Sequence, residues 1–236
     1  MAVEAVGADG CRQGWVVVAA SADDGVLDAA VLPHLADAAA WAGAVPVAVD
    51  IPIGLVDAPV READAAARVA LRGAASSVFA SPPRRLVDAL HAGEVLDHAG
   101  ASALARDTTG KGISQQTWRI CEKIAEADRL LAAGALTIWE THPEVVFRSL
   151  AHGAALARKR SYDGVRQRLA LLAEVGLEVP VGSAVGSAAT DDVLDATACA
   201  WVALGLAHDD GLVRLPPETD QVDHGRAVRM VSRRRR

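Results

Sequence analysis

Hydrophobic positions recur with two different periods along the chain, and together these periods predict an α/β protein. Three short β-rich segments come first, and the turn-prone residues between them favour an antiparallel meander. A short helix and a buried strand follow, a helical region fills the middle, and one more strand precedes the last helices. The five predicted strands cover residues 3–8, 15–20, 26–32, 45–51 and 135–139.

Apolar residues at helical spacing predict the remaining elements. The predicted helices cover residues 34–41, 60–71, 84–91, 94–106, 115–133, 143–151, 163–175 and 190–207. A three-strand meander, a crossover helix and further strands are the layout of ribonuclease-H-like folds, although order alone fits several α/β alternatives. We therefore expect one α/β domain over residues 1–230, with a mixed five-stranded sheet flanked by helices and a helical insertion at about 60–133. The basic run 231–236 is expected to be disordered.

The composition of the chain argues against several classes of function. The net charge of −6 argues against a purely electrostatic nucleic-acid binder, which would be basic. The three cysteines are widely spaced and do not have the paired spacing of a zinc site. We find no signal core and no apolar run long enough to span a bilayer, so a cytoplasmic protein without a membrane partner is the expectation.

Carboxylates stand where apolar segments end, and these positions need an explanation. Asp9, Asp50 and Glu140 each end a predicted strand, and Asp192 and Asp195 lie at the start of an apolar helix. The two helix residues are three apart and project from one side of the helix. If these groups converge, their mutual repulsion requires a cation, and Mg²⁺ or Mn²⁺ takes oxygen ligands of this kind.

Structural explanations compete at each of these positions. Asp9 precedes a glycine, where a turn aspartate is common, and Asp192 lies in the first turn of its helix, where a carboxylate favours the dipole. Asp195 lies deeper in the helix and gains less from the dipole. Asp50 lies between apolar residues, where an unpaired carboxylate would cost several kcal/mol or protonate. Asp50 and Asp195 are therefore the strongest functional candidates.

Other polar residues are weaker candidates for contacts to a substrate. Lys111 lies between two glycines, but Ile113 occupies the position at which a phosphate loop needs Ser or Thr, so a nucleotide-binding loop is excluded. Arg61 belongs to a basic helix face, which is usually only solvated. His142 and Glu144 flank the proline that begins a helix, and both have ordinary structural explanations.

Six segments in order resemble a known family. They are Gly7-Ala8-Asp9-Gly10-Cys11-Arg12-Gln13-Gly14-Trp15, Val49-Asp50-Ile51-Pro52-Ile53-Gly54-Leu55, Ser76-Ser77-Val78-Phe79, Gly110-Lys111-Gly112-Ile113-Ser114-Gln115-Gln116, Glu140-Thr141-His142-Pro143-Glu144 and Asp191-Asp192-Val193-Leu194-Asp195-Ala196. Together they resemble the domain-of-unknown-function family four-two-nine, described as predicted ribonuclease-H-like nucleases. The pair Asp192 and Asp195 also resembles the aspartates on the last helix of bacterial Holliday-junction resolvases.

The resemblance implies a divalent-metal-dependent nuclease that hydrolyses phosphodiester bonds, with two metal ions about 3.5–4 Å apart. Asp9, Asp50 and Asp192 would bind Mg²⁺ or Mn²⁺, and Glu140 and Asp195 would complete the catalytic cluster. The expected substrate contacts are Lys111, Gln115, Arg61 and His142. Two alternatives stay open, a non-catalytic module of the same fold that binds nucleic acid or another ligand, and an actin-like phosphotransferase. The choice between DNA and RNA and the oligomeric state also stay open.

Overall fold

A computed structural model describes residues 2–235, which divide into two compact units. The first unit takes in the described residues up to Asp50, together with Leu130–Val213 and the residues from Val231 on. The second unit consists of Ile51–Arg129 and Arg214–Met230. The helical insertion expected at about 60–133 lies mostly in the second unit, which also contains a segment that returns from near the C-terminus.

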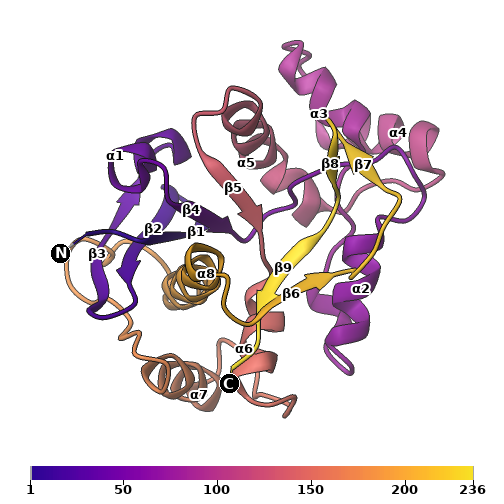
Figure 1. The fold of residues 1–236 in the computed structure, drawn as a ribbon. Coiled ribbons are helices and arrows are strands. Elements are labelled where there is room, and N and C mark those ends of the chain that lie inside the picture. Colours follow the sequence, from indigo (N-terminus) through magenta and orange to yellow (C-terminus); the bar gives the residue numbers. More distant parts are fainter. Residues whose placement is uncertain (1, 236) are drawn as a thin grey trace. The chain divides into compact units, whose positions relative to one another are not determined.

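A five-stranded mixed sheet forms the centre of the first unit (Figure 1). Strands β1 (Ala5–Cys11), β2 (Gly14–Ser21) and β3 (Gly25–Leu32) form the predicted antiparallel meander. Strands β4 (Pro46–Val49) and β5 (Thr137–Glu140) continue the sheet in parallel with β1, which gives the order β3-β2-β1-β4-β5. The predicted α/β class with a mixed five-stranded sheet is confirmed, and the sheet is consistent with a ribonuclease-H-like fold.

Helix α8 (Thr190–His208) packs against β1, β2 and β4 and is buried along most of its length (Figure 1). The approach is closest at Gly7, where an added Cβ would lie 2.1 Å from the backbone nitrogen of Ala200 and 2.2 Å from the carbonyl oxygen of Ala196. Only glycine allows backbone to come this near. The same contact fixes how far α8 reaches along the strand that carries Asp9.

The other helices of the first unit complete its layers. The short segments η1 (Leu35–Ala38) and α1 (Ala39–Ala42) connect β3 to β4. Helices α6 (Pro143–Leu150) and α7 (Tyr162–Ala173) follow β5 and pack against α8. Aliphatic side chains of α6, α7 and α8 therefore share one core with the sheet. No helix within residues 2–235 combines the length and the apolar character that a membrane crossing needs.

The second unit is helical. It contains α2 (Glu62–Ala70), η2 (Ala75–Ser77), α3 (Arg84–His91), α4 (His98–Thr109), most of α5 (Gln115–Ala132), and the short strands β7 (Val222–Asp223) and β8 (Arg226–Ala227). The guanidinium of Arg84 pairs with Asp128 at 2.7 Å and also with Asp223. This ion-pair network ties the returning segment to the helices of the same unit.

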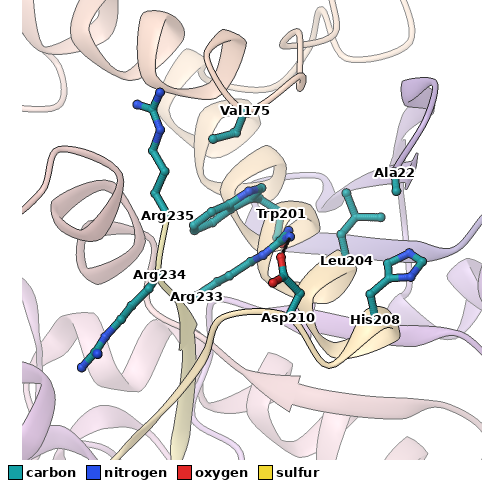
Figure 2. Close-up of a pocket in the computed structure, with 9 residues that line it drawn as sticks. All are labelled: Ala22, Val175, Trp201, Leu204, His208, Asp210, Arg233, Arg234 and Arg235. Carbon is teal, nitrogen blue, oxygen red and sulfur yellow. Dashed lines mark hydrogen bonds and ion pairs between the residues drawn. The ribbon is translucent and has the colours of Figure 1, made fainter.

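The expectation of a disordered tail over 231–236 is wrong for the described residues. Strand β9 (Met230–Arg233) pairs with β6 (Leu212–Leu215), and its first three residues are buried. Figure 2 shows why the basic run is ordered, since the guanidinium of Arg233 lies over the ring of Trp201, 5.0 Å from its centroid, and pairs with Asp210. Arg233, Arg234 and Arg235 border the adjoining cavity of about 250 Å³ (Figure 2). Arg235 has an acidic partner as well, since it pairs with Glu174. Arg236 lies outside the described residues.

Candidate metal centre

Two of the predicted acids lie side by side at the ends of parallel strands. The register pairs Ala8 of β1 with Val49 of β4, and the backbone nitrogen of Asp50 donates to the carbonyl oxygen of Ala8 at 3.2 Å. Side chains alternate along a strand, so Asp9 and Asp50, each one position further along, point to the same face of the sheet. Gly7 lies two residues before Asp9 and faces α8, which places both carboxylates on the α8 side.

Helix α8 brings a third carboxylate to this point. Asp9, Asp50 and Asp195 each offer a carboxylate oxygen, and the three atoms lie within 4.8 Å of one another. Asp9 and Asp195 are 8% and 2% exposed, and Asp50 is half-buried. Three carboxylates so close together in a buried setting require protons or a cation.

Two buried polar atoms in this region have no hydrogen-bond partner among residues 2–235. One is the Oδ1 atom of Asp195, and the other is the hydroxyl of Thr141. Thr141 lies next to Asp50, because its backbone nitrogen donates to the carbonyl oxygen of Val49 at 3.0 Å. A hard cation with its water molecules would satisfy such oxygens, so the residues present fit a divalent ion.

Burial and mutual repulsion perturb the protonation of all three carboxyl groups. Burial raises the pKa of Asp9 well above its ordinary value, and the charges of Asp50 and Asp195 raise it further. Burial likewise raises the pKa of Asp50 to about 7, although Lys159 opposes the shift. Asp195 also has its pKa raised to about 7 by burial, again against the effect of Lys159.

These shifts predict a pH dependence of stability for the metal-free protein. The pKa of Asp50 is about 7 when folded against an ordinary 3.8, so the folded state holds more protons between these values. Stability in chelator is therefore expected to fall as the pH rises from about 4 to about 7. Urea unfolding at several pH values tests this, and Asp50→Asn should flatten the slope. An unchanged slope in Asp50→Asn would contradict the proposed origin.

Asp192 is not part of this group of three. Burial raises its pKa, and so does the neighbouring charge of Asp191, while its own charge raises the pKa of Asp9. Asp192 therefore lies near enough to act electrostatically on the group. Its role as a metal ligand stays a prediction, and Asp195 occupies the place that the sequence interpretation gave to Asp192.

The predicted residues at the end of β5 and just after it lie outside the group of three carboxylates. Glu140 pairs in register with Val49, so strand alternation turns its side chain to the face opposite Asp50, although its charge still raises the pKa of Asp50. Glu144 is held by the Nη2 atom of Arg168, 2.8 Å from each carboxylate oxygen. His142 precedes α6 as its N-cap residue. The catalytic role of Glu140 and the substrate contact of His142 stay predictions.

The three remaining predicted substrate contacts belong to the second unit. Arg61 is buried, and its guanidinium donates to Asp64 at 2.7 Å and to the carbonyl oxygen of Gly54 at 2.8 Å. These contacts give Arg61 a structural role. Lys111 follows α4 and Gln115 begins α5, and both are exposed. Their contacts to a substrate stay predictions.

Two basic residues at the cluster were missed by the sequence interpretation. The Nζ atom of Lys159 lies 2.8 Å from Oδ2 of Asp195 and 3.4 Å from Oδ2 of Asp191, and the Nε atom of Arg160 donates to Asp191 at 2.9 Å. Burial lowers the pKa of Lys159, but the Asp195 carboxylate outweighs burial and raises it overall. The sequence signals were the basic run 158–160, of a kind that is usually solvated, and its similarity to a lysine-containing segment of the family that the chain resembles.

The fold and the cluster together define a class of protein, an α/β protein with a ribonuclease-H-like sheet and a buried carboxylate site able to hold a metal ion. The chain belongs to the family described as "Protein of unknown function (DUF429)", whose family model matches residues 7–221. The family resemblance inferred from the six segments is thereby confirmed. No curated protein and no solved structure matches the chain.

Proposed function

We propose that the protein is a divalent-metal-dependent hydrolase that cleaves phosphodiester bonds in nucleic acid. One observation carries this proposal, the convergence of Asp9, Asp50 and Asp195 at the carboxyl ends of two parallel strands and on the first turns of α8. A purely structural role would leave three costly buried acids and an unpartnered Asp195 oxygen without explanation.

Asp9, Asp50 and Asp195 would hold Mg²⁺ or Mn²⁺, and the charge of Asp192 acts on the same site from nearby. A bound ion of this kind supplies Lewis-acid polarisation of a phosphate oxygen and activation of water. In the hydrolysis, water adds to phosphorus, the bond from phosphorus to the leaving oxygen breaks, and a proton from water ends on that oxygen. The carboxylates of this chain would hold the ion and accept hydrogen bonds from the water, which directs the water oxygen toward phosphorus.

The charge distribution favours an anionic polymer despite the net charge of −6. Lys159 and Arg160 lie next to one another on the segment between α6 and α7, and both contact aspartates of α8. A phosphate that approaches the acidic cluster therefore meets local positive charge. Phosphate contacts of this kind weaken steeply as salt rises, so activity is expected mainly at low salt.

Nuclease activity is tested on a panel of single-stranded, duplex, hybrid and branched substrates at low salt. The wild type is expected to cleave at least one substrate with Mn²⁺ or Mg²⁺ and none with chelator. Asp9→Asn should lose about 100-fold or more of the rate, because it removes one carboxylate charge from the site. Asp163→Asn is the matched control, since Asp163 is an exposed residue of α7.

The panel also distinguishes the non-catalytic alternative. Metal binding at the cluster without turnover on any substrate would favour a binding module of the same fold. Cleavage that persists equally in Asp9→Asn would contradict the assignment of the site.

A further inference from the structure

The two carboxylate oxygens of Asp195 have different surroundings, because Lys159 contacts only one of them. Its ammonium donates to Oδ2 at 2.8 Å, whereas Oδ1 of the same carboxylate is buried without a hydrogen-bond partner in the described part of the chain. Asp195 can thus keep Lys159 on one oxygen while the other serves a cation shared with Asp9 and Asp50. Lys159 and a bound ion therefore need not exclude one another.

The ammonium of Lys159 has a donor left for a further anion. An ammonium carries three N–H donors, and the carboxylates of Asp195 and Asp191 account for two directions. The Lys159 side chain is 39% exposed, while those of Asp195 and Asp191 are 3% and 7% exposed. Lys159 thus lies between the buried carboxylates and the solvent from which a substrate arrives.

We propose that Lys159 is a catalytic residue that donates a hydrogen bond to a non-bridging phosphate oxygen of the substrate at the metal site. This inference rests on the proposed function and deepens it. The two aspartates hold the ammonium in place before the substrate arrives, so little reorganisation is needed as negative charge grows on the phosphate. Lys159 stays a charged donor throughout and transfers no proton.

The neighbours of Lys159 supply the controls. Arg158 is exposed and makes no ion pair within residues 2–235, so Arg158→Met removes a positive charge one position away without touching the cluster. Lys159→Met removes the ammonium and keeps an unbranched side chain. Lys159→Arg keeps the charge but changes the donor geometry, and it is expected to restore part of the function.

The experiment measures three quantities on the full-length wild type and these variants. They are the rise in melting temperature with Mn²⁺, the affinity for thymidine 5′-monophosphate with Mn²⁺ present, and kcat and KM on any substrate that the wild type cleaves. Lys159→Met is expected to keep the Mn²⁺ response, to bind the monophosphate at least about tenfold more weakly, and to lose about 100-fold or more in kcat. Arg158→Met is expected to match the wild type in all three.

The outcomes separate this inference from the proposed function. If the wild type cleaves nothing on the panel, the proposed function fails. The affinity for the monophosphate still tests whether Lys159 contacts phosphate. A tenfold loss of affinity confined to Lys159→Met supports the phosphate contact. Equal affinity in Lys159→Met and wild type, no monophosphate binding by the Mn²⁺-loaded wild type, or an unchanged kcat in Lys159→Met overturns the inference. A lost Mn²⁺ response in Lys159→Met also overturns it, because the lysine then serves only to build the metal site.

Discussion

Millimolar Mn²⁺ is expected to raise the melting temperature of the wild-type protein by about 5–10 °C and to leave that of Asp9→Asn almost unchanged. A ligand at a hundredfold excess over its Kd stabilises the folded state by about 2.7 kcal/mol, and 1 kcal/mol corresponds to about 2–4 °C in a chain of this size. Burial and repulsion already raise the pKa of Asp9, so the neutral amide should cost the metal-free protein little stability. Thermal melts with chelator and with Mn²⁺ measure both effects.

Asp163→Asn is again the control, because it makes the same chemical change on an exposed part of α7. It should respond to Mn²⁺ as the wild type does. Equal shifts in wild type and Asp9→Asn would remove Asp9 from the metal site. A large loss of stability in Asp9→Asn with chelator would instead indicate that the Asp9 carboxylate makes structural hydrogen bonds.

Gly7→Ala is expected to destabilise the protein by about 3 kcal/mol or more. The added methyl group would lie 2.1 Å from the backbone nitrogen of Ala200 and 2.2 Å from the carbonyl oxygen of Ala196, and neither atom can move without the helix. Moving α8 away from β1 also moves Asp195 away from Asp9, so the stabilisation by Mn²⁺ should fall as well. Urea unfolding with and without Mn²⁺ measures the two losses.

Gly100→Ala controls for the methyl group itself. A Cβ at Gly100, in α4, would meet only side-chain atoms, the nearest being Oδ1 of Asp97 at 3.3 Å. Because alanine is the better helix former, this variant should lie within about 1 kcal/mol of the wild type. A similarly small effect in Gly7→Ala would contradict the tight packing of α8 on β1.

The sheet was predictable because its signals are local. The meander β1–β3 follows from short β-rich runs separated by turn residues, and α3 has the predicted bounds, Arg84–His91. The strands β7 and β8 were not predicted because two residues carry no alternating pattern. Strands β6 and β9 were not predicted either, and the arginines that end β9 favoured a disordered tail instead. The order of β9 depends on the stacking of Arg233 on Trp201, which are far apart in the sequence.

The candidate site was only partly predictable for a similar reason. Asp9 and Asp50 could be selected because a carboxylate beside an apolar strand is costly. Whether Asp192 or Asp195 joins the carboxylate group depends on the position of α8 along β1. The close backbone contact at Gly7 fixes that position. Lys159 lies 36 positions before Asp195, and nothing in a local pattern indicates that the two meet.

The presence of a divalent ion at Asp9, Asp50 and Asp195 is tested most directly by a crystal structure grown with Mn²⁺ and measured for anomalous scattering. We expect an anomalous peak bonded to carboxylate oxygens of all three residues at about 2.0–2.3 Å, with the Oδ1 atom of Asp195 among the ligands. The same peak should be missing from crystals of Asp9→Asn. Crystals with saturating Mn²⁺ and no peak between these carboxylates would contradict the metal site and the hydrolase proposed from it.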